Sequence, residues 1–398
     1  MDKHNIVTLK DYGKALENCL SCSCGLCNKD CPAYNQLQIG SVSPRGIAQV
    51  ALGVLKGEYN ISDIPDEILY ACSGCRACEW YCGENVFLTK KTRKNVVSGA
   101  TTTEILRAMK VENGNIDPRI RDVLSNIMKF GNPYGGLPKV KDDWVNKMGI
   151  KDEEAETLLY VGSFVPYDED ARVAAEAVID ILKRAGVKFR MLGSQEMDSG
   201  SQAMMLGDEG IYEEMVEHNL EIFKKYKIKK IICFSPHDYD IFLNYYEGLE
   251  NIEVKHYTQV LWELINSKII KIGKKINKKI TYHDSCYLGR RNNIYEEPRE
   301  ILKSIPGVEL VELELSRGNS YCCGGGGPVL WMDLPNVKMD LARADQIKEL
   351  DVDVVAVACP LCLQMLKGAM DSRGYDIEVR DIAELVKDSC CIYDFNGY

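Results

Sequence analysis

The sequence predicts an α/β protein in which a helical, cysteine-rich N-terminal domain precedes two duplicated modules with parallel sheets. Two runs of closely spaced cysteines lie within the first 100 residues. From about residue 156, short apolar strands alternate with amphipathic helices, and the second half of this alternation repeats the first. We therefore expect a cysteine-rich domain (1–100), a helical connector (101–155), a first α/β module (156–270) and a second α/β module (271–398).

The composition is that of a globular protein with bound metal. The 398 residues suffice for two or three domains, and 45% are hydrophobic and 27% charged. The formal net charge of −10 argues against nonspecific nucleic-acid binding and permits a basic protein partner. Because we find neither an apolar run of spanning length nor a secretory signal, we expect a cytoplasmic protein that could associate with a membrane through a partner. The 17 cysteines favour metal binding in a reducing compartment, since they fall in the tight spacings of metal ligands.

The second cysteine run has the spacing of a bacterial ferredoxin. It is Cys72-x2-Cys75-x2-Cys78-x3-Cys82, with Gly83 where proline is usual. A pair of zinc ribbons is the alternative, which we disfavour because zinc sites rarely need two runs of four cysteines so close together. The run therefore predicts a cubane [4Fe-4S] cluster.

The first cysteine run departs from this spacing at its first position. Its later members fit, and proline follows them: Cys24, Cys27, Cys31 and Pro32. The expected first ligand falls on Ser21, so either Cys22 or Cys19 must supply that thiolate, and we favour Cys22. In such pairs of runs, the fourth cysteine of each run ligates the other cluster. We therefore expect Cys31 to complete the cluster of the second run and Cys82 to complete that of the first.

Helical patterns fill the rest of the N-terminal half. Residues 44–56 and 64–70 are expected to be the helical spacers of the cysteine-rich domain. Residues 100–155 predict helices interrupted at Asn115, at Pro118 and in the turn at 131–136. We interpret this segment as the connector that docks the first domain on the remainder.

The C-terminal half predicts two rounds of parallel strands and helices. In the first round, the expected strands are 157–161, 187–192 and 230–234, and the expected helices are 171–184 and 212–226. In the second round, the expected strands are 280–283, 308–313 and 352–357, and the expected helices are 298–304 and 339–350. Between them, the lysine-rich stretch 271–279 is interpreted as a solvated loop in preference to a binding patch.

Five cysteines of the second module form a pattern of their own. They follow Cys-x35-Cys-Cys-x35-Cys-x2-Cys and are Cys286, Cys322, Cys323, Cys359 and Cys362. Five thiolates are too many for one tetrahedral zinc, and soft sulfur ligands in excess of four suit an unusual iron–sulfur centre. The glycines that follow, Gly324–Gly327, lack the motif of a phosphate-binding loop, so we expect them to let the backbone approach a bulky cluster.

The first module has kept the repeat and lost these five cysteines. At an offset of 123 or 124 residues, they correspond to Ser163, Asp198, Ser199, Ser235 and Asp238. Gly200 then aligns with Gly324, which supports the register. We expect the five side chains to converge as an empty scaffold that shapes the approach to the remaining cluster, with His237 and Lys255 as partners for the two carboxylates. A metal held by Asp198 and Asp238 is the competing possibility.

Several other residues keep two interpretations. Arg290 and Arg291 could hold a substrate anion or pair with acidic residues of the next helix, Glu296, Glu297 or Glu300. Cys233, at the end of an apolar strand, is expected to be a core thiol. The adjacent Cys390 and Cys391 could be redox-active, but bystander cysteines are favoured.

The chain resembles the proteins that contain the CCG module of heterodisulfide reductase. The ferredoxin-like runs followed by two such modules resemble the D subunit of that enzyme, and similar layouts occur in iron–sulfur subunits of anaerobic glycerol-3-phosphate dehydrogenase and glycolate oxidase. The resemblance implies that the five cysteines of the second module hold a non-cubane [4Fe-4S] cluster, fed by two cubane clusters. The first module, without these cysteines, departs from the full reductases, which hold two such clusters.

The resemblance implies an oxidoreductase that works as a subunit of a complex. We expect it to reduce, or in reverse to form, a disulfide-type substrate at the non-cubane cluster, with a membrane cytochrome b-like or flavoprotein subunit as redox partner. The alternative is an electron-transfer subunit that links a flavoprotein dehydrogenase or electron-transfer flavoprotein to a quinone or membrane carrier. A flavin-dehydrogenase gene nearby would favour this alternative, whereas a cytochrome b-like gene would favour the reductase.

Overall fold

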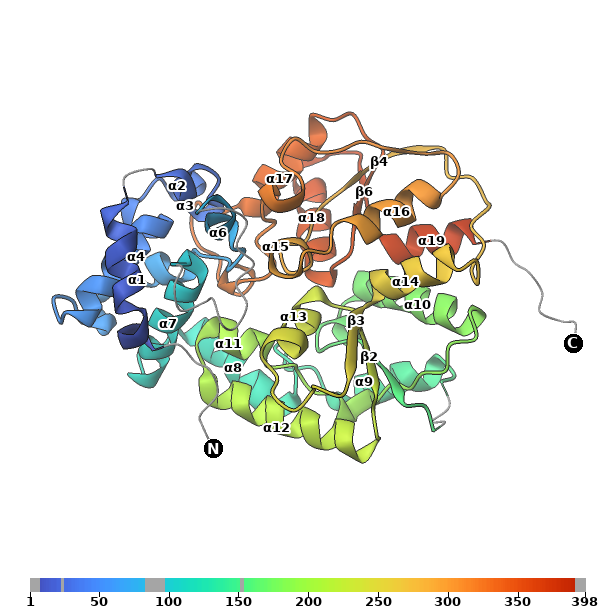
Figure 1. Ribbon diagram of the computed structural model, residues 1–398, viewed down its shortest axis with the longest axis horizontal. Helices are drawn as coiled ribbons and strands as arrows, with labels where there is room; N and C mark the ends of the chain where they lie inside the picture. The colour runs from blue at the N-terminus through green and yellow to red at the C-terminus, as the bar shows by residue number, and fades with distance from the viewer. Residues whose placement is uncertain (1–7, 23–24, 83–96, 151–153, 391–398) are drawn as a thin grey trace, which may run out of the picture.

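A computed structural model describes residues 8–22, 25–82, 97–150 and 154–390. The N-terminal helices form one body beside two α/β modules, which are drawn in green to yellow and in orange to red (Figure 1). The expected α/β class, with a helical N-terminal domain and parallel sheets behind it, is confirmed.

The N-terminal body consists of short helices around a small apolar core. They are α1 (Leu9–Ser21), α2 (Leu26–Lys29), α3 (Pro32–Leu37), α4 (Pro44–Leu55), α5 (Asp66–Tyr70) and α6 (Ala77–Tyr81). Helix α4 begins where expected, because the Ser43 hydroxyl accepts a hydrogen bond from the Gly46 amide and proline occupies the first helical position. Leu16 and Ala48 are fully buried where α1 packs on α4.

Three helices connect this body to the first module. They are α7 (Gly99–Glu112), α8 (Pro118–Phe130) and α9 (Pro138–Lys147). Proline begins α8 and α9, and Gly131 ends α8 with a φ of 66°, a conformation that glycine adopts without strain. Helix α7 contributes Leu106 to the N-terminal core, while its Arg107 donates hydrogen bonds to the Leu69 carbonyl and to the Met205 carbonyl of the first module. The connector therefore contacts both sides.

The first module is a three-stranded parallel sheet flanked by helices. Its elements are β1 (Thr157–Tyr160), α10 (Glu169–Arg184), α11 (Ser201–Leu206), α12 (Glu209–Lys225), β2 (Lys230–Cys233), α13 (Pro236–Asn244), β3 (Glu253–His256) and α14 (Tyr257–Asn266), with strand order β1-β2-β3. The expected strand at 187–192 is wrong: only Arg190 forms a bridge, to Leu158. Cys233 is fully buried in the core.

The second module repeats this arrangement with one more strand. Its elements are β4 (Lys278–Tyr282), α15 (Gly289–Asn292), α16 (Glu296–Ser304), β5 (Val308–Leu310), α17 (Met339–Lys348), β6 (Val354–Val357), α18 (Pro360–Arg373), β7 (Glu378–Asp381) and α19 (Ile382–Ser389). All strands pair in parallel in the order β5-β4-β6-β7. Strands β4, β6 and β7 thus correspond to β1, β2 and β3.

The two modules pack through corresponding helices. Helix α10 contacts α19, and α14 contacts α16. Because α10 corresponds to α16 and α14 to α19 in the repeat, the two contacts are related by an approximate internal two-fold axis. The Tyr257 hydroxyl donates to both carboxylate oxygens of Asp381, at 2.7 and 2.9 Å, across this interface. The modules therefore face each other, and so do the loops that follow β2 and β6.

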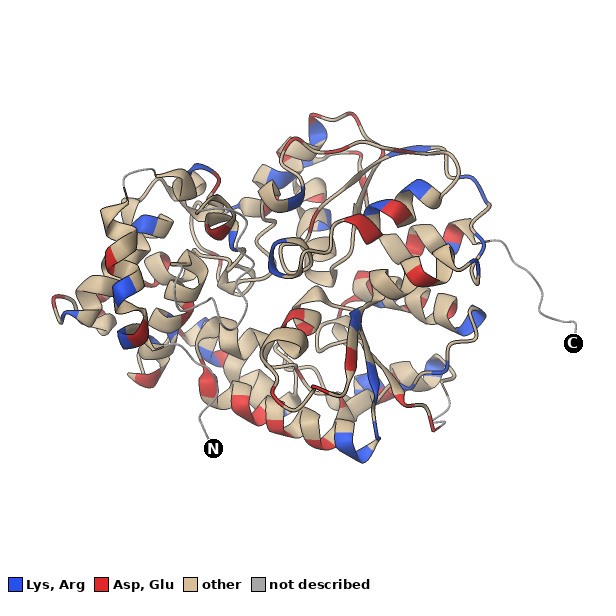
Figure 2. Cartoon of the chain, viewed as in Figure 1, with Lys and Arg blue, Asp and Glu red and all other residues tan. Residues whose placement is uncertain are grey.

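Helix α12 carries acidic residues along its length and basic ones at its C-terminal end (Figure 2). The lysines at 271–279 are mostly exposed, and this loop pairs with the C-terminal end through the Gly273 amide and the Ser389 carbonyl. Among the described helices, none has the length and apolar character needed to cross a bilayer.

Candidate metal centre

The five cysteines of the second module converge on the carboxyl edge of its sheet. Cys286 follows β4, Cys322 and Cys323 lie between β5 and α17, and Cys359 and Cys362 follow β6. Each is at most 8% exposed. The Sγ atoms of Cys323 and Cys362 are 3.4 Å apart. Cys286 and Cys322 belong to one group of buried side chains that pack together. The carboxyl ends of adjacent parallel strands lie side by side, which explains how residues distant in sequence meet.

A backbone amide and a helix N-terminus face the cysteine sulfurs of the second module. The Gly324 amide donates to Cys322 Sγ at 3.3 Å. Cys359 is the N-cap residue of α18, and Cys362 lies in the first turn, at the positive end of the helix dipole. Hydrogen bonds with Cys323 and Cys359, together with burial, nevertheless raise the pKa of Cys362 well above its ordinary value. Burial acts to raise the pKa of Cys359, but hydrogen bonding with Cys362 and His237 outweighs burial and lowers the pKa to about 5. A set of five buried thiols with donors around it fits an iron–sulfur cluster.

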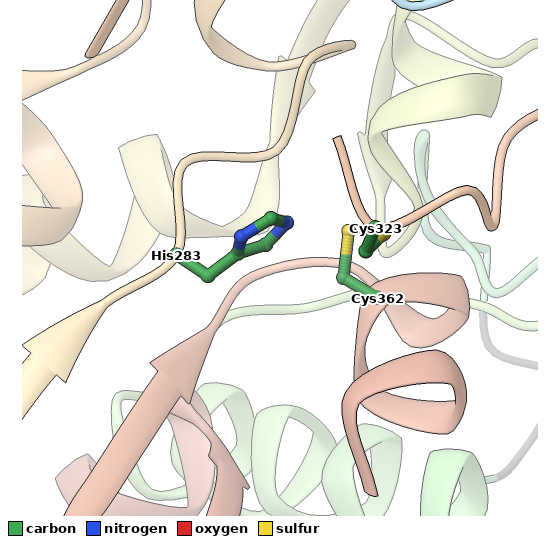
Figure 3. A group of neighbouring side chains, drawn as sticks. All are labelled: His283, Cys323 and Cys362. Atoms are coloured by element: carbon green, nitrogen blue, oxygen red, sulfur yellow. Dashed lines mark hydrogen bonds between the residues drawn. The ribbon is translucent and has the colours of Figure 1, made fainter. Parts of the chain in front are cut away.

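His283 joins the sulfur cluster, although the sequence did not single it out. A nitrogen of His283 and the sulfurs of Cys323 and Cys362 all lie within 4.8 Å of one another (Figure 3). The buried Arg343 donates from Nε to His283 Nδ1 at 3.2 Å. Because arginine only donates, Nδ1 must accept, and the ring proton lies on Nε2. His283 therefore presents an N–H donor toward the thiols. Its position three residues before Cys286, at the end of a strand, was the available signal.

A buried ion pair fixes the loop that carries Cys286. Asp284 accepts two hydrogen bonds from Arg299, at 2.7 and 2.8 Å, and a third from the Arg317 amide. Arg299 also pairs with Glu312, at 2.6 and 2.8 Å. The Ser320 hydroxyl donates to the Asp284 carbonyl, which ties this loop to the one before Cys322. The two ligand loops are thus held in a fixed relation.

The glycine run packs where three parts of the chain meet. A Cβ on Gly326 would lie 2.7 Å from the His237 ring and 3.0 Å from the Tyr287 ring. A Cβ on Gly327 would lie 2.5 Å from the Cα atom of Ser73, in the N-terminal body. The absence of side chains on these glycines therefore lets the first module and the N-terminal body lie close to the five cysteines. The sequence predicted only that the glycine backbone itself would approach a bulky cluster.

Four cysteines of the N-terminal body surround a second site. One cavity is lined by Cys31, Cys72, Cys75 and Cys78, the set expected from the exchange of fourth ligands between the two runs. A hydrogen bond to Cys322 and burial raise the pKa of Cys75 well above its ordinary value, and burial raises that of Cys72. Buried thiols become thiolates when a cation balances their charge, so the donor set fits a cubane cluster.

The remaining cysteines of the two runs lie nearer the surface. Cys22 and Cys82 are exposed and Cys27 is partly buried, whereas Cys24 lies outside the described residues. Cys19 belongs to α1 and packs against the N-terminal core. The assignment of Cys22 as a cluster ligand stays a prediction, and the packing of Cys19 is compatible with it. Cys390 is partly buried in a bridge with Ile272, and Cys391 lies outside the described residues.

The N-terminal site abuts the sulfur cluster of the second module. The Ser73 hydroxyl donates to Cys322 Sγ at 3.4 Å. Arg290 donates to the Cys75 carbonyl at 2.7 Å, and Arg291 donates to the Gly74 carbonyl at 2.9 Å. The expected pairing of the two arginines with the next helix is therefore wrong, because both donate hydrogen bonds to carbonyls of the N-terminal body. The expectation that they hold a substrate anion stays a prediction.

Arg291 also forms an ion pair with Asp240 at 3.1 Å. Glu296, which we expected to pair with Arg290 or Arg291, forms an ion pair with Arg317. Arg290 and Arg291 thus form polar contacts between the N-terminal body and the two modules.

The five residues that replace the cysteines in the first module also converge. Ser163, Asp198, Ser199, Ser235 and Asp238 line one cavity. Ser163 donates to Asp198 at 2.5 Å, and Ser199 donates to Asp238 at 2.6 Å, so the set is bonded to itself. His237 lines the same cavity. The expected role of Lys255 is wrong, because it pairs with Glu253 and Glu263 at 2.9 and 2.5 Å.

A buried lysine of the connector takes the place expected for Lys255. Lys141 donates to the Glu196 carbonyl at 2.5 Å and interacts with both aspartates of the set. Burial raises the pKa of Asp198, and burial with the charges of Asp198 and Glu196 raises that of Asp238 well above the ordinary range. No pattern in the sequence indicated Lys141, because the connector is remote from the module in the chain.

Two models of known protein families match separate parts of the chain. Residues 15–86 match the model of a 4Fe-4S dicluster domain, and residues 280–367 match that of a cysteine-rich domain, CCG. The chain is 30% identical over 397 residues to the D subunit of the dihydromethanophenazine:CoB--CoM heterodisulfide reductase of Methanosarcina acetivorans, and the match covers 92% of each protein. The chain belongs to the family of the heterodisulfide reductase D subunit. It is an iron–sulfur protein of an oxidoreductase family.

Two other relatives of the chain are not named as heterodisulfide reductases. The chain is 34% identical over 372 residues to "Probable iron-sulfur-binding oxidoreductase FadF" of Bacillus subtilis. This match covers 88% of the chain and 51% of FadF. It is 28% identical over 439 residues to "EtfAB:quinone oxidoreductase" of Syntrophomonas wolfei. This match covers 96% of the chain and 60% of that protein. The chain thus spans only about half to three fifths of these two proteins.

Proposed function

We propose that this chain is the iron–sulfur subunit of an oxidoreductase complex and carries electrons between a flavoprotein partner and a quinone or membrane carrier. The observation that carries the proposal is the contact between the two cysteine-bearing parts of the chain. Ser73 donates to Cys322, and a hydrogen bond joins Cys75 to Cys322, so the inner N-terminal site and the second-module site are immediate neighbours. Clusters bound at these sites would supply single-electron transfer.

The proposed ligands follow from the sites described. One cubane cluster is assigned to Cys31, Cys72, Cys75 and Cys78, and the other to Cys22, Cys24, Cys27 and Cys82. The non-cubane [4Fe-4S] cluster is assigned to Cys286, Cys322, Cys323, Cys359 and Cys362. Because Cys22 and Cys82 are exposed whereas Cys75 and Cys78 are buried, the outer cubane site would meet a redox partner and the inner one would connect it to the second module.

Two observations favour electron transfer over disulfide chemistry. Only the second module has thiols at the five ligand positions, since the first module holds bonded serine and aspartate pairs in the corresponding places. A protein with one such centre lacks the second one that would face a disulfide from the other side. In addition, the relative from Syntrophomonas wolfei is named for electron-transfer flavoprotein and quinone, and its similarity covers 96% of this chain.

Reduction or formation of a disulfide-type substrate at the second-module centre is the second candidate. The relative from Methanosarcina acetivorans, which this chain covers to 92%, is named as a heterodisulfide reductase subunit. The cavity of the first module also extends to Pro360 and Leu361, between two of the five cysteines, so a small substrate could approach the centre from that side.

The two candidates are separated by adding oxidants to the anaerobically reduced complex, purified with its native partners. Reoxidation of the iron–sulfur signals by duroquinone through the partner, with none by oxidised glutathione or other soluble disulfides, is the expected result. The same assay with Cys323→Ser should show slowed reoxidation by the quinone. Disulfide cleavage that disappears in Cys323→Ser, without quinone-linked reoxidation in the wild type, would instead establish the second candidate.

A further inference from the structure

Arg290 lies where the two cysteine-bearing parts of the chain meet. It belongs to α15, which begins shortly after Cys286. Its Nε donates to the Cys75 carbonyl at 2.7 Å, and its Nη1 donates to the carbonyl of Ser320, which shortly precedes Cys322 in the sequence. The side chains of these three cysteines pack in one buried group. The guanidinium is therefore fixed between the inner N-terminal site and the second-module site.

The positive charge of Arg290 lacks an acidic partner among the residues that the structure describes. Its hydrogen bonds there all end on backbone carbonyls, and its Nη2 is buried without a hydrogen-bond partner. The adjacent Arg291, in contrast, forms ion pairs with Asp240 at 3.1 Å and with Glu104 at 3.5 Å. Removing a charge from water without a counter-charge is strongly unfavourable. The environment of Arg290 therefore calls for negative charge at the adjoining cysteine sites.

Two fully buried arginines repeat this pattern, each at one of the two sites. Arg107 donates to the Cys72 carbonyl of the inner N-terminal site, and Arg343 donates to His283 Nδ1 beside the second-module site. Neither forms an ion pair with a carboxylate within the described parts of the chain, since their other hydrogen bonds go to carbonyl, amide and hydroxyl oxygens. Of these three arginines, Arg290 is the one that contacts both cysteine-bearing parts.

We propose that Arg290 is a counter-charge shared by the inner cubane cluster and the second-module cluster, and that its fixed positive charge raises the reduction potentials of both. Each electron that a cluster accepts adds negative charge, which a nearby buried cation stabilises because water screens it little. Arg107 and Arg343 would act in the same way on one cluster each. This inference rests on the proposed function, which supplies the two clusters.

The test is an anaerobic redox titration of the holoprotein, followed by electron paramagnetic resonance. In Arg290→Gln, which removes the charge and keeps N–H donors, the potentials of the inner cubane cluster and of the second-module centre should both become more negative than in the wild type. Arg290→Lys keeps the charge but not the planar fork of donors, so both potentials should stay close to those of the wild type. The outer cubane cluster should change least and serves as the internal reference.

Arg343→Gln is the matched control, because it also removes a buried charge without an acidic partner, but from the second module alone. It should shift the potential of the second-module centre and leave that of the inner cubane cluster unchanged. Equal shifts of both centres in this control would contradict the inference, since they would show that the potentials do not report local charge.

The two Arg290 variants decide between a charge effect and a structural one. Unchanged potentials in Arg290→Gln, a shift of only one of the two centres, or equal shifts in the Gln and Lys variants would overturn the shared counter-charge. Loss of the centres in Arg290→Gln with retention in Arg290→Lys would support it, whereas loss in both variants would overturn it. A wild type without a second-module centre would overturn the proposed function itself, and the other outcomes concern Arg290 alone.

Discussion

Ser73 and Cys322 lie 249 residues apart in the sequence, yet the Ser73 hydroxyl donates a hydrogen bond of 3.4 Å to the Cys322 thiol. Ser73 follows the first cysteine of the second ferredoxin-like run, and Cys322 is one of the five cysteines of the second module. This contact joins two sites that belong to different parts of the chain. The proposed electron transfer between the two sites therefore depends on their relative position, in addition to the ligands of each site.

The first prediction concerns the arginine that holds these parts together. Arg290 is partly buried and donates to the carbonyls of Cys75, Gly318 and Ser320. In Arg290→Ala, the carbonyls lose a charged donor, so the free energy of unfolding should fall by about 3 kcal/mol in chemical denaturation. Arg373→Ala, which breaks an exposed pair with Asp345, should cost less than about 1 kcal/mol. Equal losses would show that Arg290 has no special role.

A second prediction contrasts two glycines. In Gly326→Ala, the new methyl group would meet the buried, stacked rings of His237 and Tyr287, and the variant should lose about 1–3 kcal/mol of stability. Gly368 lies within α18, and a methyl group added there would have open space around it, so Gly368→Ala should be neutral or stabilise the protein by up to about 1 kcal/mol. Thermal unfolding of both variants measures the difference. A Gly326→Ala variant as stable as Gly368→Ala would contradict the packing described.

Much of the fold could be predicted because its signals are local. Apolar strands such as 230–234 and helices such as 171–184 carry their period in the sequence, and the repeat fixes which elements correspond. The expected strand at 187–192 failed because its edge position leaves Arg190 with a single bridge. Propensity cannot tell whether a neighbouring strand is present to pair with, so edge strands are where such predictions are weakest.

The site was predictable where the ligands themselves form a pattern. The spacing placed the five cysteines of the second module and the five residues of the first module in two sets, and each set converges. The residues around them were not predictable. Lys141, Arg343 and Ser73 reach the sites from distant segments, and their identities carry no spacing signal. Lys255 was chosen for its closeness in sequence, but its strand directs it toward Glu253 and Glu263.

A third prediction concerns pH and the contact between the modules. Burial raises the pKa of Asp381 from its ordinary value to about 8. The folded protein therefore holds a proton on Asp381 that the unfolded chain releases near pH 4, so stability should fall as pH rises toward 8 and level off above it. The slope from this group is at most about 1.4 kcal/mol per pH unit.

Denaturant unfolding of the wild type and Asp381→Asn between pH 6 and pH 9 measures this contribution. The asparagine cannot titrate, so the difference in unfolding free energy between the two proteins should change with pH and become constant above about pH 8. A difference that is independent of pH over the whole range would show that Asp381 is ionised in the folded protein despite its burial.

The fourth prediction is the number of iron atoms. Two cubane clusters and one non-cubane cluster amount to about twelve iron atoms per chain. Iron and sulfide analysis of anaerobically purified protein measures this number. A value near sixteen would mean that the first module holds a cluster in spite of its serine and aspartate pairs. A value near eight would show that the second module holds no cluster.

The central claim is that the five cysteines of the second module hold a cluster of their own beside the inner cubane site. Electron paramagnetic resonance of Cys323→Ser, prepared anaerobically and compared with the wild type at matched potentials, tests it most directly. We predict that the variant lacks the signal of the second-module centre and retains both cubane signals, with about eight iron atoms left per chain. Spectra identical to those of the wild type would contradict the claim.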